Sequence, residues 1–316
     1  MKKLTLLIPI YNESRNMHAL AEAVTPLINN RLTTEKYDWE VLLVNDGSTD
    51  TSLAAMAALH AADSRFQYLD LSRNFGKENA MLAGLDFAAG DAVIIMDADL
   101  QDPVEVIPEM IRQWEAGYDD VYGRRRSRGK ESALRRKLSL TFYGLLQKFT
   151  RIDILPNVGD FRLLDRICVN ALRQMRENQR YTKGLFCWIG FNKKEVLFDR
   201  NDRPGGKSSF SYRSLFNLAI DGITSFTTVP LRLASVMGLF TAMCSIMYLC
   251  YVLVRTLLYG DPVAGFPTIM CVMLFLGGCQ LIALGIIGEY IARIFTETKQ
   301  RPPYLVKSLN GKRLDS

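Results

Sequence analysis

The chain has 316 residues, enough for one large domain and an appendage. Its formal net charge is +6, and its mean hydropathy of +0.03 hides an uneven distribution, because apolar residues are concentrated after residue 230. This pattern excludes a uniformly water-exposed protein, and the six cysteines, which include no C-x-x-C pair, are interpreted as reduced packing thiols.

Alternating strands and helices are predicted for the first part of the chain. Short apolar runs that end in polar or turn residues predict strands at Leu4–Ile10, Glu40–Val44, Phe66–Leu71 and Ala92–Met96. The segments between them predict helices at Ser14–Asn29, Ser52–Ala62 and Lys77–Ala89. This alternation predicts an α/β fold with right-handed crossovers and a mostly parallel sheet covered on both faces.

Polar clusters follow three of the predicted strands: "YNES" after the first, "NDGSTD" after the second and "DADLQDP" after the fourth. In a parallel sheet, ligands bind beyond the carboxyl ends of the strands, so the three clusters are expected to line one crevice. The chain has no G-x-G-x-x-G after the first strand and no G-x-x-x-x-G-K-[ST], which argues against a dinucleotide oxidoreductase or a P-loop enzyme.

The cluster "DADLQDP" places several carboxylates directly after a buried strand. Neighbouring carboxylates repel each other and are costly to bury without a cation. Asp97 and Asp99 lie two residues apart, so both side chains can project to one face and hold Mg²⁺ or Mn²⁺ together with water and a substrate diphosphate. Gln101 and Asp102 are close enough to complete or orient this shell. A solvated turn is the alternative for D-x-D alone, and the three matching clusters favour the metal site.

The cluster "NDGSTD" combines a turn with a helix start. Gly47 relaxes the backbone, and Ser48, Thr49 or Asp50 can cap the next helix. Asp46, at the strand tip, is the residue expected to contact the base or ribose of a nucleotide.

Two basic segments follow the predicted sheet. Residues 124–137 have a local charge balance of +7, and apolar residues at helical spacing continue to residue 149, which favours a helix lying on an anionic membrane. A nucleic-acid partner and a helix docked on the soluble core are the alternatives. The loop "RNDRPGGKSSFS" carries Arg203 and Lys207 around two glycines, a composition suited to gripping phosphate oxygens, with a surface loop as the alternative.

The last third of the chain predicts a membrane hairpin. Residues 233–254 and 266–287 each form 22-residue stretches without a charged side chain. Each would span roughly 33 Å as a helix, enough to cross a bilayer core of about 30 Å. Basic residues flank the outer ends of the two stretches, which predicts that both ends are cytoplasmic. The predicted organisation is a catalytic domain at 1–211, an amphipathic interface helix at 212–231, the hairpin at 232–290 and a cytoplasmic tail at 291–316.

The combination of "PIYNE", "NDGSTD", "RNFGKENAMLAGLDFAAGD", "DADLQDP", "GDFRLLDR", "RPGGKSSFS" and a two-span hairpin resembles the family-2 polyprenyl-phosphate glycosyltransferases, which have a Rossmann-like GT-A fold. The bacterial undecaprenyl-phosphate (bactoprenol) glucosyltransferases are the most similar group. Dolichol-phosphate mannose synthases and the formamidoarabinose transferase of lipid A modification are more distant. The resemblance covers nearly the whole chain.

The resemblance implies a set of site residues. Asp97, Asp99 and Asp160 would be catalytic, with Asp160 helping to position the acceptor, and the metal ligands would be Asp97, Asp99 and Gln101. The residues that would bind the nucleotide sugar are Pro9, Tyr11, Glu13, Asp46, Lys77, Arg203 and Lys207. Those that would hold the lipid phosphate are Arg125, Arg135 and Ser139.

The resemblance implies that the enzyme transfers a sugar, expected to be glucose, from a UDP-sugar to undecaprenyl phosphate with inversion at the anomeric carbon. The reaction would require Mg²⁺ or Mn²⁺ and would take place at the cytoplasmic face of the bacterial inner membrane. A lipid phosphate is anionic at neutral pH and attacks without a strong general base, which agrees with the presence of only two histidines. Alternatives are an N-acetylhexosamine or formamidoarabinose donor, a processive polysaccharide synthase, or a noncatalytic sugar-nucleotide sensor. The resemblance also implies a homotetramer and no nucleic-acid partner.

Overall fold

The structure is a computed structural model, and it describes residues 1–30, 36–126, 158–178, 180–199, 229–259 and 265–314. The chain divides into two compact units. The first comprises Met1–Phe216 together with Arg301–Ser316, and the second comprises Asn217–Gln300.

In the described residues the first unit contains a nine-stranded sheet of order β7-β5-β6-β4-β1-β2-β3-β8-β9. The strands are β1 (Lys2–Ile10), β2 (Tyr37–Asn45), β3 (Phe66–Leu71), β4 (Ala92–Ile95), β5 (Asp120–Arg125), β6 (Val158–Asp165), β7 (Lys193–Phe198), β8 (Val306–Leu309) and β9 (Lys312–Arg313). The helices are α1 (Met17–Ile28), α3 (Ser52–Ala62), α4 (Lys77–Phe87), α5 (Ile107–Glu115), α7 (Arg166–Gln174) and α8 (Thr182–Trp188), with a 3₁₀ turn at Val104–Val106.

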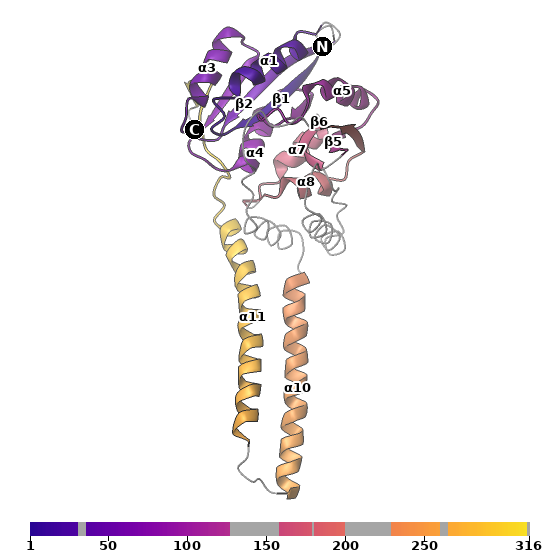
Figure 1. The fold of residues 1–316 in the computed structure, drawn as a ribbon, viewed down its shortest axis with the longest axis vertical. Coiled ribbons are helices and arrows are strands. Elements are labelled where there is room, and N and C mark those ends of the chain that lie inside the picture. The colour runs from indigo at the N-terminus through magenta and orange to yellow at the C-terminus, as the bar shows by residue number, and fades with distance from the viewer. Residues whose placement is uncertain (31–35, 127–157, 179, 200–228, 260–264, 315–316) are drawn as a thin grey trace. The chain divides into compact units, whose positions relative to one another are not determined.

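The strands β4, β1, β2 and β3 form a continuous parallel core. Because β1 is buried on both faces, it is apolar without alternation: Leu6 and Ile8 join the cluster that includes α1, whereas Leu7 meets Gly84 of α4. Figure 1 shows helices on both sides of this sheet. The predicted α/β class is confirmed, and the four predicted strands and three predicted helices are present with ends shifted by a few residues at most.

An antiparallel strand, β6, lies between β4 and β5. Its register pairs Ile95 with Arg162, so two residues further along Asp97 lies opposite Asp160. The strand is fixed by Arg162, whose Nη1 lies 2.9 Å from Asp120 Oδ2 in a fully buried ion pair. The guanidinium also lies 3.6 Å from the ring centre of Phe186 in α8. This strand overlaps the motif "GDFRLLDR" and was not among the predicted strands.

The carboxyl-terminal residues add two strands to the same sheet. β8 pairs antiparallel with β3, and β9 pairs with β8. Side chains reinforce the pairing, because Asn310 Oδ1 accepts a hydrogen bond from the Tyr68 amide and Tyr304 donates to Asp86. The predicted tail at 291–316 therefore contains a structured part of the first unit, which local sequence patterns did not indicate.

The second unit contains two long helices, α10 (Val229–Tyr259) and α11 (Phe266–Thr298), which contact each other. Among the described residues, one stretch, Phe275–Thr298, is long and apolar enough to cross a membrane. Leu233–Tyr248 in α10 is apolar but shorter. The predicted pair of spans thus falls on two helices, and their membrane crossing stays a prediction. Of the predicted interface helix, only residues 229–231 are described, as the start of α10.

Candidate active site

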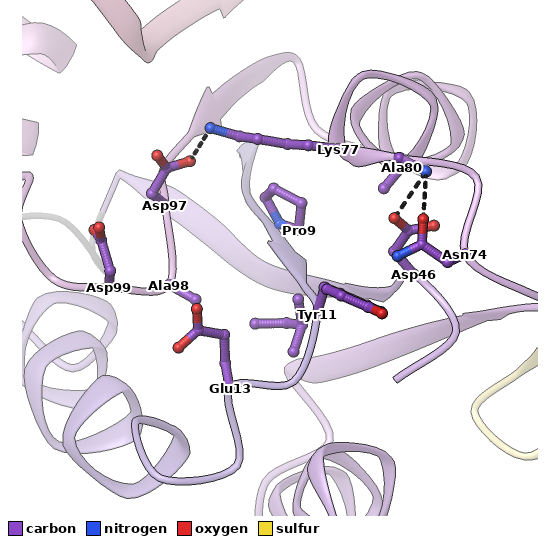
Figure 2. A pocket seen from close by; sticks show the side chains of 12 residues that line it. Pro9, Tyr11, Glu13, Asp46, Asn74, Lys77, Ala80, Asp97, Ala98 and Asp99 are labelled. Atoms are coloured by element: carbon purple, nitrogen blue, oxygen red, sulfur yellow. Dashed lines mark hydrogen bonds and ion pairs between the residues drawn. The ribbon is translucent and has the colours of Figure 1, made fainter. Parts of the chain in front are cut away.

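One pocket lies at the carboxyl ends of β1, β2 and β4 (Figure 2). The chain order of the sheet reverses at β1 and β4, which is where doubly wound folds bind ligands. Seven predicted site residues line this pocket: Pro9, Tyr11, Glu13, Asp46, Lys77, Asp97 and Asp99. The other lining residues were not among the predicted site residues; they are Ile10, Asn74, Gly76, Ala80 and Ala98.

The loops after β1 and β2 are joined by hydrogen bonds between the two polar clusters. The Asn12 amide donates to Ser48 Oγ at 3.0 Å, and Asn12 Oδ1 accepts from the Thr49 amide at 2.8 Å. Asn12 has a positive φ of 56°, an uncommon conformation that these two bonds stabilise. The Glu13 amide donates to Ser52 Oγ, at the start of α3. These hydrogen bonds fix the rim of the pocket that carries Tyr11 and Glu13.

Asp46 holds the loop that leads into α4. Its two carboxylate oxygens accept hydrogen bonds from the amides of Phe75 at 2.7 Å and Gly76 at 2.9 Å. Burial raises the pKa of the Asp46 carboxyl, and this effect exceeds the lowering by the two amides. The predicted contact of Asp46 with a base or ribose stays a prediction, and the structure adds a positioning role for Asp46 that sequence patterns did not indicate.

A strained turn follows Asp99 and helps to hold its carboxylate in place. Asp99 Oδ1 accepts a hydrogen bond from the Gln101 amide at 3.2 Å. The residue between them, Leu100, has a φ of 54°, a left-handed conformation that costs a non-glycine residue about 1–2 kcal/mol. Backbone strain of this kind is concentrated at ligand sites. The Gln101 side chain is buried, and its Oε1 has no hydrogen-bond partner in the described part of the chain.

Lys77 connects Asp97 to Asp160 on β6. Its Nζ lies 2.6 Å from Asp97 Oδ1 and 2.7 Å from Asp160 Oδ2. Burial lowers the pKa of the Lys77 ammonium, but the charges of Asp160 and Asp97 outweigh burial and raise that pKa overall. Burial likewise raises the pKa of Asp160, and the charges of Lys77 and Lys183 more than reverse this effect, so the Asp160 pKa lies below its ordinary value. Lys77 and Asp160 are therefore both charged at neutral pH.

The remaining predicted residues are only partly described. Arg125, at the end of β5, lies near this edge of the sheet, with its Nη2 3.9 Å from Asp102 Oδ1. Neither Arg125, Gln101 nor Asp160 lines the pocket itself. The other predicted residues, Arg135, Ser139, Arg203 and Lys207, lie outside the described residues, as do both predicted basic segments beyond residue 126. No three His, Cys, Asp or Glu side chains converge as metal ligands within the described ranges.

The sequence matches two known families. Residues 5–173, which include most of the parallel core and all the residues that line the pocket, match Glycosyl transferase family 2. The chain belongs to glycosyltransferase family 2. This glycosyltransferase also matches a second family, the GtrB C-terminal hairpin, over residues 229–294, which contain α10 and most of α11.

Several curated proteins resemble this glycosyltransferase over nearly its full length. A putative glycosyltransferase of Bacillus subtilis is 45% identical, over 97% of this chain and 92% of its own. A bactoprenol glucosyl transferase of Shigella phage SfX is 42% identical, over 97% of this chain and 99% of its own. The resemblance to family-2 glycosyltransferases of the bactoprenol type is therefore confirmed.

Solved structures with a similar fold are more distant. Glucosyl-3-phosphoglycerate synthase from Mycobacterium tuberculosis, in complex with Mn²⁺, UDP-glucose and phosphoglyceric acid, is 17% identical with a TM-score of 0.47, and the match covers 71% of this chain and 78% of that one. A mannosyltransferase from Pyrobaculum calidifontis, in complex with GDP-mannose and Mn²⁺, is 14% identical with a TM-score of 0.43, over 90% of this chain and 87% of that one.

Proposed function

We propose that this glycosyltransferase transfers glucose from UDP-glucose to undecaprenyl phosphate, with inversion at the anomeric carbon and with Mg²⁺ or Mn²⁺, at the cytoplasmic face of a bacterial inner membrane. The observation that carries the proposal is that seven predicted site residues, five for the nucleotide sugar and two for the metal, line one pocket at the switch point of a family-2 sheet. Relatives at 42% identity over nearly the whole chain are named bactoprenol glucosyl transferases, which supports the acceptor and the sugar.

The residues present fit a divalent ion bound together with its substrate. Asp97 and Asp99 line the same pocket, and a cation, the Lys77 ammonium, already lies 2.6 Å from Asp97 Oδ1. Gln101 Oε1 is a buried oxygen without a hydrogen-bond partner in the described residues. Two carboxylates with few other protein ligands suit Mg²⁺ or Mn²⁺, whose other positions go to water and phosphate. When bound, the ion would neutralise the negative charge that develops on the departing diphosphate.

The chain's own residues supply positioning and charge. An acceptor phosphate oxygen attacks the anomeric carbon, the bond from that carbon to the diphosphate oxygen breaks, and UDP departs from the opposite face. Tyr11, Asp46 and Asn74 lie on the side of the pocket away from Asp97 (Figure 2), and we place the nucleoside there. Lys77 lies beside Asp97 and Asp160, where its charge stabilises the diphosphate. Arg125 approaches from β5 and would contact the acceptor phosphate.

The helical hairpin gives the enzyme access to a lipid substrate. Large apolar side chains on α10 and α11 are exposed, among them Leu239, Phe240, Leu281 and Leu284. Exposed apolar surface of this extent is stable in a bilayer and unfavourable in water. Moving a polyprenyl tail out of the bilayer costs about 0.8 kcal/mol per CH₂ group, so the catalytic site must act at the headgroup plane. Basic residues at the outer ends of the hairpin support a cytoplasmic orientation for the catalytic domain.

A transfer assay with the purified full-length enzyme tests the proposal. Radiolabelled glucose should move from UDP-glucose to a short-chain polyprenyl phosphate when Mg²⁺ or Mn²⁺ is present, and chelation should stop the reaction. Asp99→Ala should lower the rate about a hundredfold or more, since charge stabilisation at the leaving group is lost. Asp38→Ala removes an exposed carboxylate outside the pocket and should react like the wild type. An undiminished rate for Asp99→Ala would show that the metal assignment is wrong.

The sugar is tested separately with a panel of UDP-sugars. We expect UDP-glucose to give the highest kcat/KM, with UDP-N-acetylglucosamine and UDP-4-deoxy-4-formamido-arabinose as the competing donors. Higher efficiency with either competitor would replace glucose in the proposal and leave the acceptor and the reaction class unchanged. Nucleotide binding without transfer to any polyprenyl phosphate would instead support a noncatalytic sensor.

A further inference from the structure

We propose that Lys77 is an internal counter-cation, which occupies the cation position beside Asp97 in the donor-free enzyme and moves to the donor's diphosphate when the divalent ion binds. The consequence is that the metal ion and the nucleotide bind cooperatively, and that the ion alone binds weakly. This inference rests on the proposed function, because it assumes that a divalent ion and a nucleotide diphosphate share the pocket.

The first observation is the geometry of the ammonium. Lys77 Nζ makes contacts below 3 Å with one oxygen of Asp97 and one of Asp160 (the first contact is drawn in Figure 2). Asp97 follows the end of β4 and Asp160 lies on the neighbouring antiparallel strand β6, and one ammonium contacts both carboxylates, so without a cation between them they would repel. Lys77 therefore neutralises Asp97 in the donor-free enzyme, as a divalent ion would do when the ion and the donor are bound.

The second observation concerns which of these groups can move. The Lys77 side chain is 42% exposed, whereas that of Asp160 is only 10% exposed and is fixed on β6. A lysine ammonium is a compact charge on a flexible four-carbon chain, so it can change partners without a backbone shift. An ion that binds Asp97 would place two or more positive charges beside this ammonium, and the resulting repulsion would drive Lys77 off Asp97.

The third observation is the position of Lys77 in α4, where it is the first helical residue. A cation at a helix N-terminus opposes the helix dipole and the unpaired amide groups, whereas an anion there is stabilised. Lys77 is thus poorly placed to stabilise its helix and well placed to receive an anion. The preceding loop is anchored by Asp46, whose carboxylate accepts from the Gly76 amide, so the start of the helix faces the pocket.

Together these observations predict a thermodynamic coupling. Metal binding must break the contact between Lys77 and Asp97, which lowers the affinity of the ion when no anion is available for the released ammonium. A bound diphosphate supplies that anion and restores the affinity. The coupling is reciprocal, so UDP must raise the affinity for Mn²⁺ by the same factor by which Mn²⁺ raises the affinity for UDP.

The experiment measures Mn²⁺ binding to the full-length enzyme by electron paramagnetic resonance of the free ion, with and without UDP, and requires no turnover. In Lys77→Met, Mn²⁺ alone should bind about tenfold more tightly than in the wild type, equivalent to about 1.4 kcal/mol, and the enhancement by UDP should shrink by a similar factor. Lys77→Arg keeps the charge and should keep weak binding of the ion alone. Lys36→Met removes a lysine paired with Glu115 outside the pocket and controls for the change in net charge.

Each outcome is decisive. Equal Mn²⁺ affinity in the wild type and in Lys77→Met, with an undiminished enhancement by UDP, would overturn the inference and leave the proposed function intact. Absence of Mn²⁺ and Mg²⁺ binding in every variant, even with UDP, would overturn the metal part of the proposed function and the inference with it. If Lys77→Met does not fold, Lys77→Met combined with Asp160→Asn is compared with Asp160→Asn alone, and the same tightening is expected.

Discussion

Replacing Gly47 by alanine should destabilise the enzyme and weaken donor binding through one contact between two loops. Gly47 has a φ of 64°, a conformation that costs alanine about 1–2 kcal/mol. An added Cβ would lie 2.4 Å from the carbonyl carbon of Arg73 and from the amide nitrogen of Asn74. These are backbone atoms, so the loop itself must shift, and overpacking of this kind adds about 1–3 kcal/mol.

The summed cost for Gly47→Ala is about 2–5 kcal/mol, which at about 2–4 °C per kcal/mol corresponds to a melting temperature roughly 4–20 °C lower. The shifted loop carries Asn74 and Gly76, which line the pocket, so the affinity for UDP should fall about tenfold or more. Thermal unfolding followed by circular dichroism and UDP titration by calorimetry measure the two effects on the same preparation.

The matched control is Gly117→Ala. Gly117 also has a positive φ, of 98°, but apart from its chain neighbours no heavy atom of the described residues lies within 4 Å of an added Cβ, and Gly117 does not line the pocket. This variant should lose stability through backbone strain alone and bind UDP like the wild type. If Gly47→Ala binds UDP as tightly as Gly117→Ala does, the contact between the two loops does not position the donor site.

Three further predictions concern the elements that support the pocket. Arg162→Met removes the ion-pair partner of the buried Asp120 and should lower the free energy of unfolding by about 3–5 kcal/mol. The double variant Arg162→Met with Asp120→Leu should recover most of this loss. Equal melting temperatures of the wild type and the single variant would contradict the prediction. Because the pKa of Asp160 lies below its ordinary value, the stabilisation from ionised Asp160 is present above about pH 4 and is lost as the pH falls below it. The melting temperature of Asp160→Asn should therefore fall less between about pH 5 and about pH 3 than that of the wild type, and parallel curves would refute the assignment. Deletion of residues 301–316 removes β8 and β9. The Ser72 amide, which donates to the Leu305 carbonyl, should then exchange its hydrogen faster. Unchanged protection of this amide would mean that the tail is not paired with the sheet in solution.

The parallel half of the catalytic unit was predictable because its signals are local. Continuous apolar runs are typical of strands buried on both faces, and the observed β3 and α3 have the predicted bounds. The general rule that ligands lie beyond the carboxyl ends of parallel strands then predicted that the clusters around Tyr11, Asp46 and Asp97 would meet, as they do in the pocket. No knowledge of the exact strand order was needed for this step.

The sequence by itself thus determined the fold class, seven of the residues that line the pocket and the two long apolar helices, since each follows from patterns within a few neighbouring residues or from a motif. Only the tertiary structure decided that β6 enters antiparallel and sets Asp160 opposite Asp97, that Lys77 bridges the two, and that the tail pairs with β3. These contacts join residues 83 positions apart for Lys77 and Asp160 and 242 apart for Tyr68 and Asn310. Their partners are selected by packing of the whole sheet and by neutralisation of buried charge, which no local pattern specifies.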